Sequence, residues 1–145
     1  MAFTGNYACN GFKTGLASGT FNFNTGTTQV FKIALYTNAA TLNATTTGYT
    51  STGEVSATGY TAGGTVLTIN QIPVVTVNTT VMYFSFANAS WTSALTARGA
   101  LIYKFDGATN PAICVLDFGS DKTSANTFTV QFPTPSTSTA IIRIQ

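Results

Sequence analysis

From residue 29 to the end of the chain, apolar side chains alternate with polar or smaller ones, which is the period of a β-strand. The alternation recurs in about eight segments: TQVFKIALYT, TVLTI, QIPVVTV, VMYFSFA, RGALIYKF, AICVLDF, NTFTVQF and STAIIRI. The connections are rich in Gly, Asn, Asp and Pro and contain no helical pattern of the length that a parallel crossover needs. The sequence therefore predicts an all-β fold, an antiparallel two-sheet sandwich that is jelly-roll-like or immunoglobulin-like, with about eight strands.

The segment before these strands has a different period. In YACNGFKTGLAS, residues 7–18, the side chains of Cys9, Phe12 and Leu16 have the spacing of one helical face. Asn6 precedes this pattern and is a candidate N-cap, because its side chain can accept a hydrogen bond from the first turn. One short N-terminal helix is therefore expected.

The length of 145 residues suits one domain, and we predict a single β-sandwich domain over residues 1–145. Residues 1–28 would form an N-terminal arm. Residues 38–64 would form a loop that is longer than a compact domain usually tolerates without a reason. Three larger side chains of this loop are candidates for pinning it to the sandwich: Tyr49, Val55 and Tyr60.

Charged residues make up only 7% of the chain, against about 25% in an ordinary soluble domain. Thr, Ser and Asn take their place, and charged residues are also depleted in the cores of protein interfaces. The composition fits either a protein whose surface is occupied in an assembly or a small β domain of mild composition. The net charge is +2 and the basic residues are scattered, so we expect no nucleic-acid partner, which would need a basic stripe.

No apolar run reaches the roughly 18 residues of a membrane helix, so no membrane partner is expected. The N-terminal sequence MAFTGNYACNGFK lacks the features of a secretory signal, which predicts a protein made in a cytosol. Cys9 and Cys114 are far apart along the sequence, and Cys114 lies in the apolar run AICVLDF. In a reducing compartment, buried free thiols are the expected state of both.

The chain contains no histidine, which removes His-based triads, the commonest general bases and most zinc sites. Asp117 and Asp121 lack the further ligands of a calcium loop and are expected to shape a turn. Glu54 and Asp106 could form a glycosidase pair, although a lone Glu in a Thr-rich loop is more often solvated or lightly paired. Trp91 is expected in the core or at a sheet edge and not on a sugar-binding surface. We predict no catalytic residue, no cofactor and no metal site.

The order in which several sequence segments follow one another is similar to that of a known family. It begins with NYACNGFKTGLASGTFNF, continues through FKIALYTNAATLNATTTGYTSTGEVSATGYTAGGTVLTI and YFSFANASWTSALTARGALIYK, and ends with AICVLDFG and FTVQFPTPSTSTAIIRI. This order resembles small virion structural proteins of tailed bacteriophages. The resemblance implies a non-enzymatic part of the particle that is made in the host bacterial cytoplasm.

Of the positions in such a particle, we expect that of a head decoration or cement protein on the outer capsid surface. Its partners would be the major capsid protein and copies of itself. The alternatives are a neck, tail or fibre-associated position, or a carbohydrate-binding module that uses Trp91 or Tyr60. Six residues of the arm and the loop are predicted to contact the capsid or a partner: Phe3, Tyr7, Phe12, Tyr49, Glu54 and Tyr60.

Overall fold

The structure is a computed structural model that describes residues 3–145. Within that range the elements are β1 (Tyr7–Ala8), α1 (Asn10–Ala17), β2 (Val30–Tyr36), β3 (Thr65–Leu67), β4 (Ile69–Val75), β5 (Met82–Phe86), β6 (Ala89–Trp91), β7 (Leu95–Phe105), β8 (Ala112–Ser124), β9 (Phe128–Val130) and β10 (Ile142–Ile144). The predicted all-β class with one short helix is confirmed. Each of the eight predicted segments contains a strand, and β1 and β6 are short additions.

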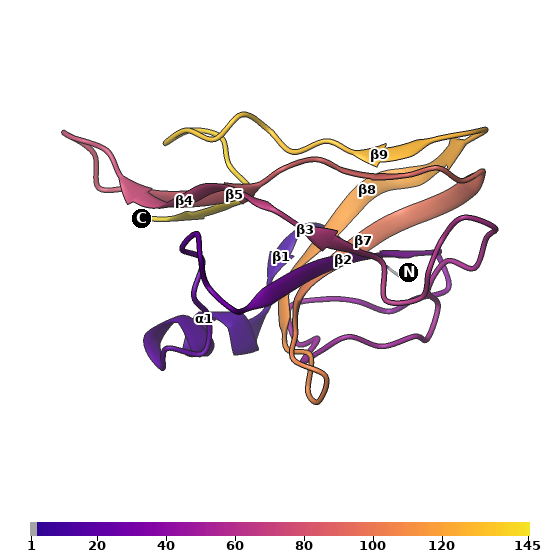
Figure 1. Cartoon of the computed structure of the whole chain (residues 1–145), viewed down its shortest axis with the longest axis horizontal. Coiled ribbons are helices and arrows are strands. Elements are labelled where there is room, and N and C mark those ends of the chain that lie inside the picture. Colours follow the sequence, from indigo (N-terminus) through magenta and orange to yellow (C-terminus); the bar gives the residue numbers. More distant parts are fainter. Residues whose placement is uncertain (1–2) are drawn as a thin grey trace.

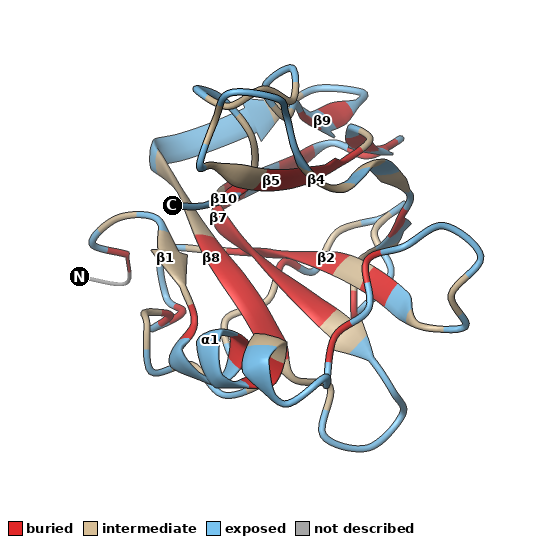
Figure 2. Ribbon diagram, turned by 90° about the vertical axis from the view of Figure 1, so that its left-hand side faces the viewer, coloured by how far each residue is buried: buried red, intermediate tan, exposed pale blue. Residues whose placement is uncertain are grey.

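The strands form a sandwich whose pairs are all antiparallel. The larger sheet has the order β1-β8-β7-β2-β3, and a second sheet has the order β10-β5-β4. A separate pair, β6 and β9, lies beside them. Figure 2 shows the second sheet above the larger one, with buried residues along the facing parts of β2, β7, β8 and β5. In β2, Phe31, Ile33 and Leu35 are buried as the alternation indicates, but Ala34 and Tyr36 on the opposite face are buried as well.

The N-terminal segment fills the core of this sandwich. The ring of Phe23 lies 4.7 Å from that of Phe31 in the larger sheet and 4.2 Å from that of Phe84 in the second sheet, and both pairs are stacked. Phe12 packs edge-on against Phe23 at 6.0 Å. Such aromatic pairs stabilise a core by about 1 kcal/mol each beyond the burial of their area. Residues that were expected to form an arm are therefore packed within their own domain.

The helix begins later than the sequence pattern indicated. Cys9 occupies the N-cap position, and residues 7–8 form β1. Asn6 therefore does not cap the helix. Its side-chain oxygen instead accepts a hydrogen bond of 2.7 Å from the backbone N–H of Asp117, which holds the start of β1 against β8. The pairing of β1 with β8 determines where the helix begins. The helical spacing of the sequence does not reveal this pairing.

Both cysteines are buried and unlinked in the described structure, as the sequence predicted. Burial raises the pKa of the Cys9 thiol to about 11, and burial likewise raises the pKa of Cys114. Both are therefore neutral thiols at ordinary pH. Among residues 3–145 no helix is long and apolar enough to cross a membrane.

Candidate partner-binding surfaces

The connection between β2 and β3, residues 37–64, is organised by one carboxylate. Tyr49 Oη donates a hydrogen bond of 2.6 Å to Oε2 of Glu54, and Tyr60 Oη donates one of 2.7 Å to Oε1. The backbone N–H of Gly63 donates a third, also of 2.7 Å, to Oε1. Hydrogen bonds to a charged group are among the stronger ones in proteins. Glu54 is therefore held by three hydrogen bonds within its own chain, more than the solvated or lightly paired side chain that was expected.

This carboxylate is tied to the larger sheet through the same tyrosines. Tyr60 Oη accepts a hydrogen bond of 2.9 Å from the backbone N–H of Leu35 in β2. The ring of Tyr49 stacks on that of Tyr103 in β7, with centroids 5.0 Å apart. Tyr103 Oη in turn donates a hydrogen bond of 2.7 Å to the backbone oxygen of Gly63. The connection thus covers the outer face of β2 and β7, and Tyr49 and Tyr60 pin it there as predicted.

The environment of Glu54 changes the acidity of the surrounding hydroxyls. Burial, together with the negative charge of Glu54, raises the pKa of Tyr103 from its usual 10.0 to about 12. Burial and Glu54 also raise the pKa values of Tyr36, Tyr49 and Tyr60. The stabilisation linked to Tyr103 is fully present below pH 10 and is lost as the pH rises through about 12. The cluster is thus a neutral network of donors around one carboxylate over the ordinary pH range.

The six residues predicted to contact a partner fall into two groups. Phe3 and Phe12 are 2% and 1% exposed, so their side chains are part of the core and leave almost no surface for a neighbouring subunit. Their apolar character, which suggested contact, is used within the domain. Tyr7 is half-buried, and its hydroxyl is hydrogen-bonded to Thr4. Tyr49, Glu54 and Tyr60 are half-buried and bound to one another, and contact by these four residues remains a prediction.

The carboxylates of Asp117 and Asp106 each interact with a different part of the chain. Asp117 forms an ion pair with Arg98 on β7 and also accepts a hydrogen bond of 2.8 Å from the N–H of Gly119. Asp106 lies in the turn between β7 and β8, where its Oδ1 accepts hydrogen bonds from the backbone N–H groups of Ala108 and Asn110. No group of three or more potential metal-ligating carboxylates or thiols occurs within the described residues.

Trp91 is 6% exposed, as expected for a core or sheet-edge residue. Its ring packs between those of Tyr60, at 6.0 Å, and Phe128, at 6.4 Å. Tyr60 uses its hydroxyl on Glu54 and Leu35. A flat sugar could not stack on Trp91 without displacing these neighbours, so the carbohydrate alternative loses its main residue.

The β4–β5 hairpin presents apolar side chains to solvent. Val77 at its tip is 88% exposed, and Val75 and Ile72 on β4 are 56% and 40% exposed. In Figure 1 this tip extends from the end of the molecule opposite the 37–64 connection. Alternation predicted the strand but not the exposure, because period 2 does not say which face remains uncovered.

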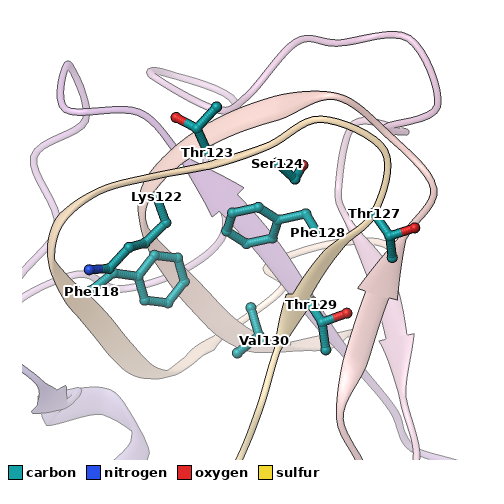
Figure 3. A pocket seen from close by; sticks show the side chains of 8 residues that line it. All are labelled: Phe118, Lys122, Thr123, Ser124, Thr127, Phe128, Thr129 and Val130. Atoms are coloured by element: carbon teal, nitrogen blue, oxygen red, sulfur yellow. The ribbon is translucent and has the colours of Figure 1, made fainter.

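A second apolar feature is a hollow of about 420 Å³ between the outer half of β8 and β9. Figure 3 shows Phe118, Phe128 and Val130 at its wall, with Lys122 extending past the ring of Phe118. The two rings are 6.1 Å apart. Its remaining wall consists of hydroxyl-bearing side chains: Thr123, Ser124, Thr127 and Thr129. The hollow is open and holds no pair of carboxylates.

Comparisons with protein-family models, with curated proteins and with solved structures found no match to this chain. Inferences about its function therefore depend on its residues, their geometry and the resemblance of its segments.

Proposed function

We propose that this protein is a non-enzymatic structural component of a tailed-bacteriophage particle, in the position of a head decoration or cement protein. It would bind the outer capsid surface and stabilise contacts between major capsid subunits. The proposal is supported by the resemblance of its segments and, above all, by one feature of the chain: no Asp, Glu, Lys or Arg occurs from residue 55 to residue 97.

This uncharged run occupies a defined part of the fold. It contains β3 to β6, and therefore two of the three strands of the second sheet together with the exposed hairpin tip. The large exposed apolar side chains of this run are Val66, Ile72, Val75 and Val77. A free protein normally separates such side chains with charges that keep it soluble.

Burial in an assembly gives a physical reason for this pattern. A charge at the centre of an interface must lose its water, whereas Val, Thr and Asn are desolvated at lower cost. A protein that binds the assembled shell and not its separated subunits stabilises the shell by mass action. Because the shell repeats, several weak contacts add up through avidity.

An enzymatic role has less support from the arrangement of acidic groups. Glu54 is enclosed by tyrosines, Asp106 shapes a turn and Asp117 pairs with Arg98. A glycosidase needs two carboxyl groups about 5–10 Å apart across a substrate cleft. Each of these three acids is instead engaged by its own surroundings.

The test is to locate the chain in purified particles of the phage that encodes it. Its copies should be distributed over the shell in a fixed ratio to the major capsid protein, measured by quantitative mass spectrometry and immunolabelling. Particles that lack it should release DNA at a lower temperature, and added purified protein should restore the original value. Copies confined to one vertex would overturn the decoration role, and absence from particles would overturn the virion role.

A further inference from the structure

The two sheets open onto a shared groove on one side of the molecule. The groove has a volume of about 730 Å³ and lies between β1 and α1 on one wall and β10 on the other. Figure 2 shows β1 and the C-terminal strand one above the other on that side. Partly exposed apolar side chains contribute to its surface, among them Leu16, Leu116 and Ile141. A strand laid in this groove would find both an apolar surface and a sheet edge.

Each wall includes the edge of a sheet. β1 is the outermost strand of the larger sheet, and β10 is the outermost strand of the second sheet. Over Ile142–Ile144, β10 pairs with β5 on one side, and in the described structure no strand lies on its other side. An open edge has backbone N–H and C=O groups directed outward, which can pair with an added strand.

The opposite edge of the same sheet is protected against such pairing. β4 contains Pro73, which has no N–H to donate, and its register with β5 shifts at two places. The outer half of β8 is also irregular, because Ala97 and Gly99 of β7 face Lys122 and Asp117, which leaves residues 118–121 opposite Arg98 alone. β10 has a regular register with β5 and contains no proline. Its edge is therefore the more receptive one.

The charges at the groove indicate what it would accept. Lys13 and Arg143 line it, and no Asp or Glu side chain of the described chain does so. Both basic side chains are exposed, and their hydrogen-bond partners are neutral: Asn10 Oδ1 at 3.4 Å for Lys13 and the backbone oxygen of Thr137 at 2.9 Å for Arg143. A second copy would bring the same positive charges face to face. An acidic segment would complement them.

We propose that this groove binds an extended, acidic segment of another protein as an added strand beside β10. Alternate apolar side chains of that segment enter the groove, and its carboxylates pair with Lys13 and Arg143. The short β10 offers only a few backbone hydrogen bonds, so a single site binds weakly and gains strength from repetition. Only the identity of the donor, a subunit of the shell, rests on the function proposed above.

The test uses the whole ¹⁵N-labelled chain and a short capped peptide in which Val alternates with Glu. A matched peptide has Lys in place of Glu. We expect the acidic peptide to bind about tenfold more tightly, with amide shifts concentrated at residues 6–8 and 141–145. Shifts elsewhere, equal binding of both peptides or no binding would overturn the proposal.

Charge reversal provides the matched variants. The double variant Lys13→Glu, Arg143→Glu should reverse the preference between the two peptides. Lys122→Glu makes the same kind of change at an exposed residue outside the groove and should leave the preference unaltered. If the double variant folds and keeps the original preference, the proposal is wrong. A dimer that forms through these residues without peptide would also overturn it. The peptide assay does not depend on where the protein lies in a particle. The groove proposal can therefore fail while the virion role stands, and the virion role can fail while the groove proposal stands.

Discussion

The 37–64 connection and the β4–β5 hairpin both extend from the sandwich and have almost no charge. The connection is packed against the sandwich, whereas the hairpin exposes its apolar side chains. The connection is held against β2 and β7 by the tyrosines around Glu54. The hairpin contains no carboxylate and leaves Val75 and Val77 exposed. The difference teaches that in a chain with so few charges, one well-placed acceptor can bind a long polar segment to its own domain. A segment without such an acceptor keeps its apolar surface free for another molecule.

The largest effect is expected where the connection returns to the sheet. Gly64 has φ +71°, and a Cβ at this position would collide with the backbone oxygen of Ile33. We expect Gly64→Ala to reduce the free energy of unfolding by about 4 kcal/mol, measured by urea denaturation. Gly11→Ala is the control, because apart from its chain neighbours and the backbone of its own helix no described atom lies within 4 Å of its Cβ position. It should stabilise the protein by up to about 1 kcal/mol. Equal effects of the two variants would contradict a tightly docked connection.

Removal of the central acceptor should have the next largest effect. Glu54→Ala leaves Tyr49, Tyr60 and the N–H of Gly63 without their shared partner. We expect a loss of about 3 kcal/mol of stability and faster hydrogen exchange in residues 37–64. Asp121→Ala, which removes an exposed carboxylate, should change stability by less than about 0.5 kcal/mol. If Glu54→Ala unfolds no more easily than Asp121→Ala, the carboxylate does not organise the connection.

A carboxylate, that of Asp106, also organises the turn between β7 and β8. Its contribution to stability is expected to be smaller and to depend on pH. Hydrogen bonds from the backbone of Asn110 and Ala108 lower the pKa of Asp106 from 3.8 to about 2. The contribution of this depressed pKa is present above about pH 4 and is lost as the pH falls through about 2. After correction for the intrinsic pH dependence of amide exchange, the protection of residues 106–110 should therefore fall over this range, while that of the β4–β5 turn, which has no carboxylate, should not change. Asp106→Asn should abolish the response, and its persistence in that variant would assign it to another group.

The smallest change in stability is expected at the hairpin tip. Val77 is almost fully exposed, so Val77→Asp should alter the free energy of unfolding by less than about 0.5 kcal/mol. If the uncharged run faces the shell, the same variant should bind particles less well, because a carboxylate would lose its water at the interface. Thr14→Asp introduces a carboxylate at an exposed position of α1, outside the run, and should retain binding. Normal binding of Val77→Asp would remove the hairpin from the proposed contact.

The predictions that the structure confirmed depend on patterns among residues that are close together in the sequence. Alternation located all eight predicted strands, and the apolar surroundings of Cys114 predicted a buried thiol. The pinning role of Tyr49 and Tyr60 was also accessible, because large aromatic residues in a Thr-rich segment need a surface to pack on. The N-cap at Asn6 was wrong because β1 competes for the residues that a helical pattern alone would assign to the first turn.

The sequence by itself determined the fold class, the short helix and the absence of histidine chemistry, because periodicity and composition act over a few residues. Only the tertiary structure decided that Phe3 and Phe12 belong to the core and that Glu54 is enclosed by tyrosines. It also decided that the edges of β1 and β10 share one groove. Tyr7 pairs with Val115, and β10 returns to β5 from the far end of the chain. Such pairings depend on which strands bury their apolar faces together, and alternation within a strand is the same whichever neighbour it finds.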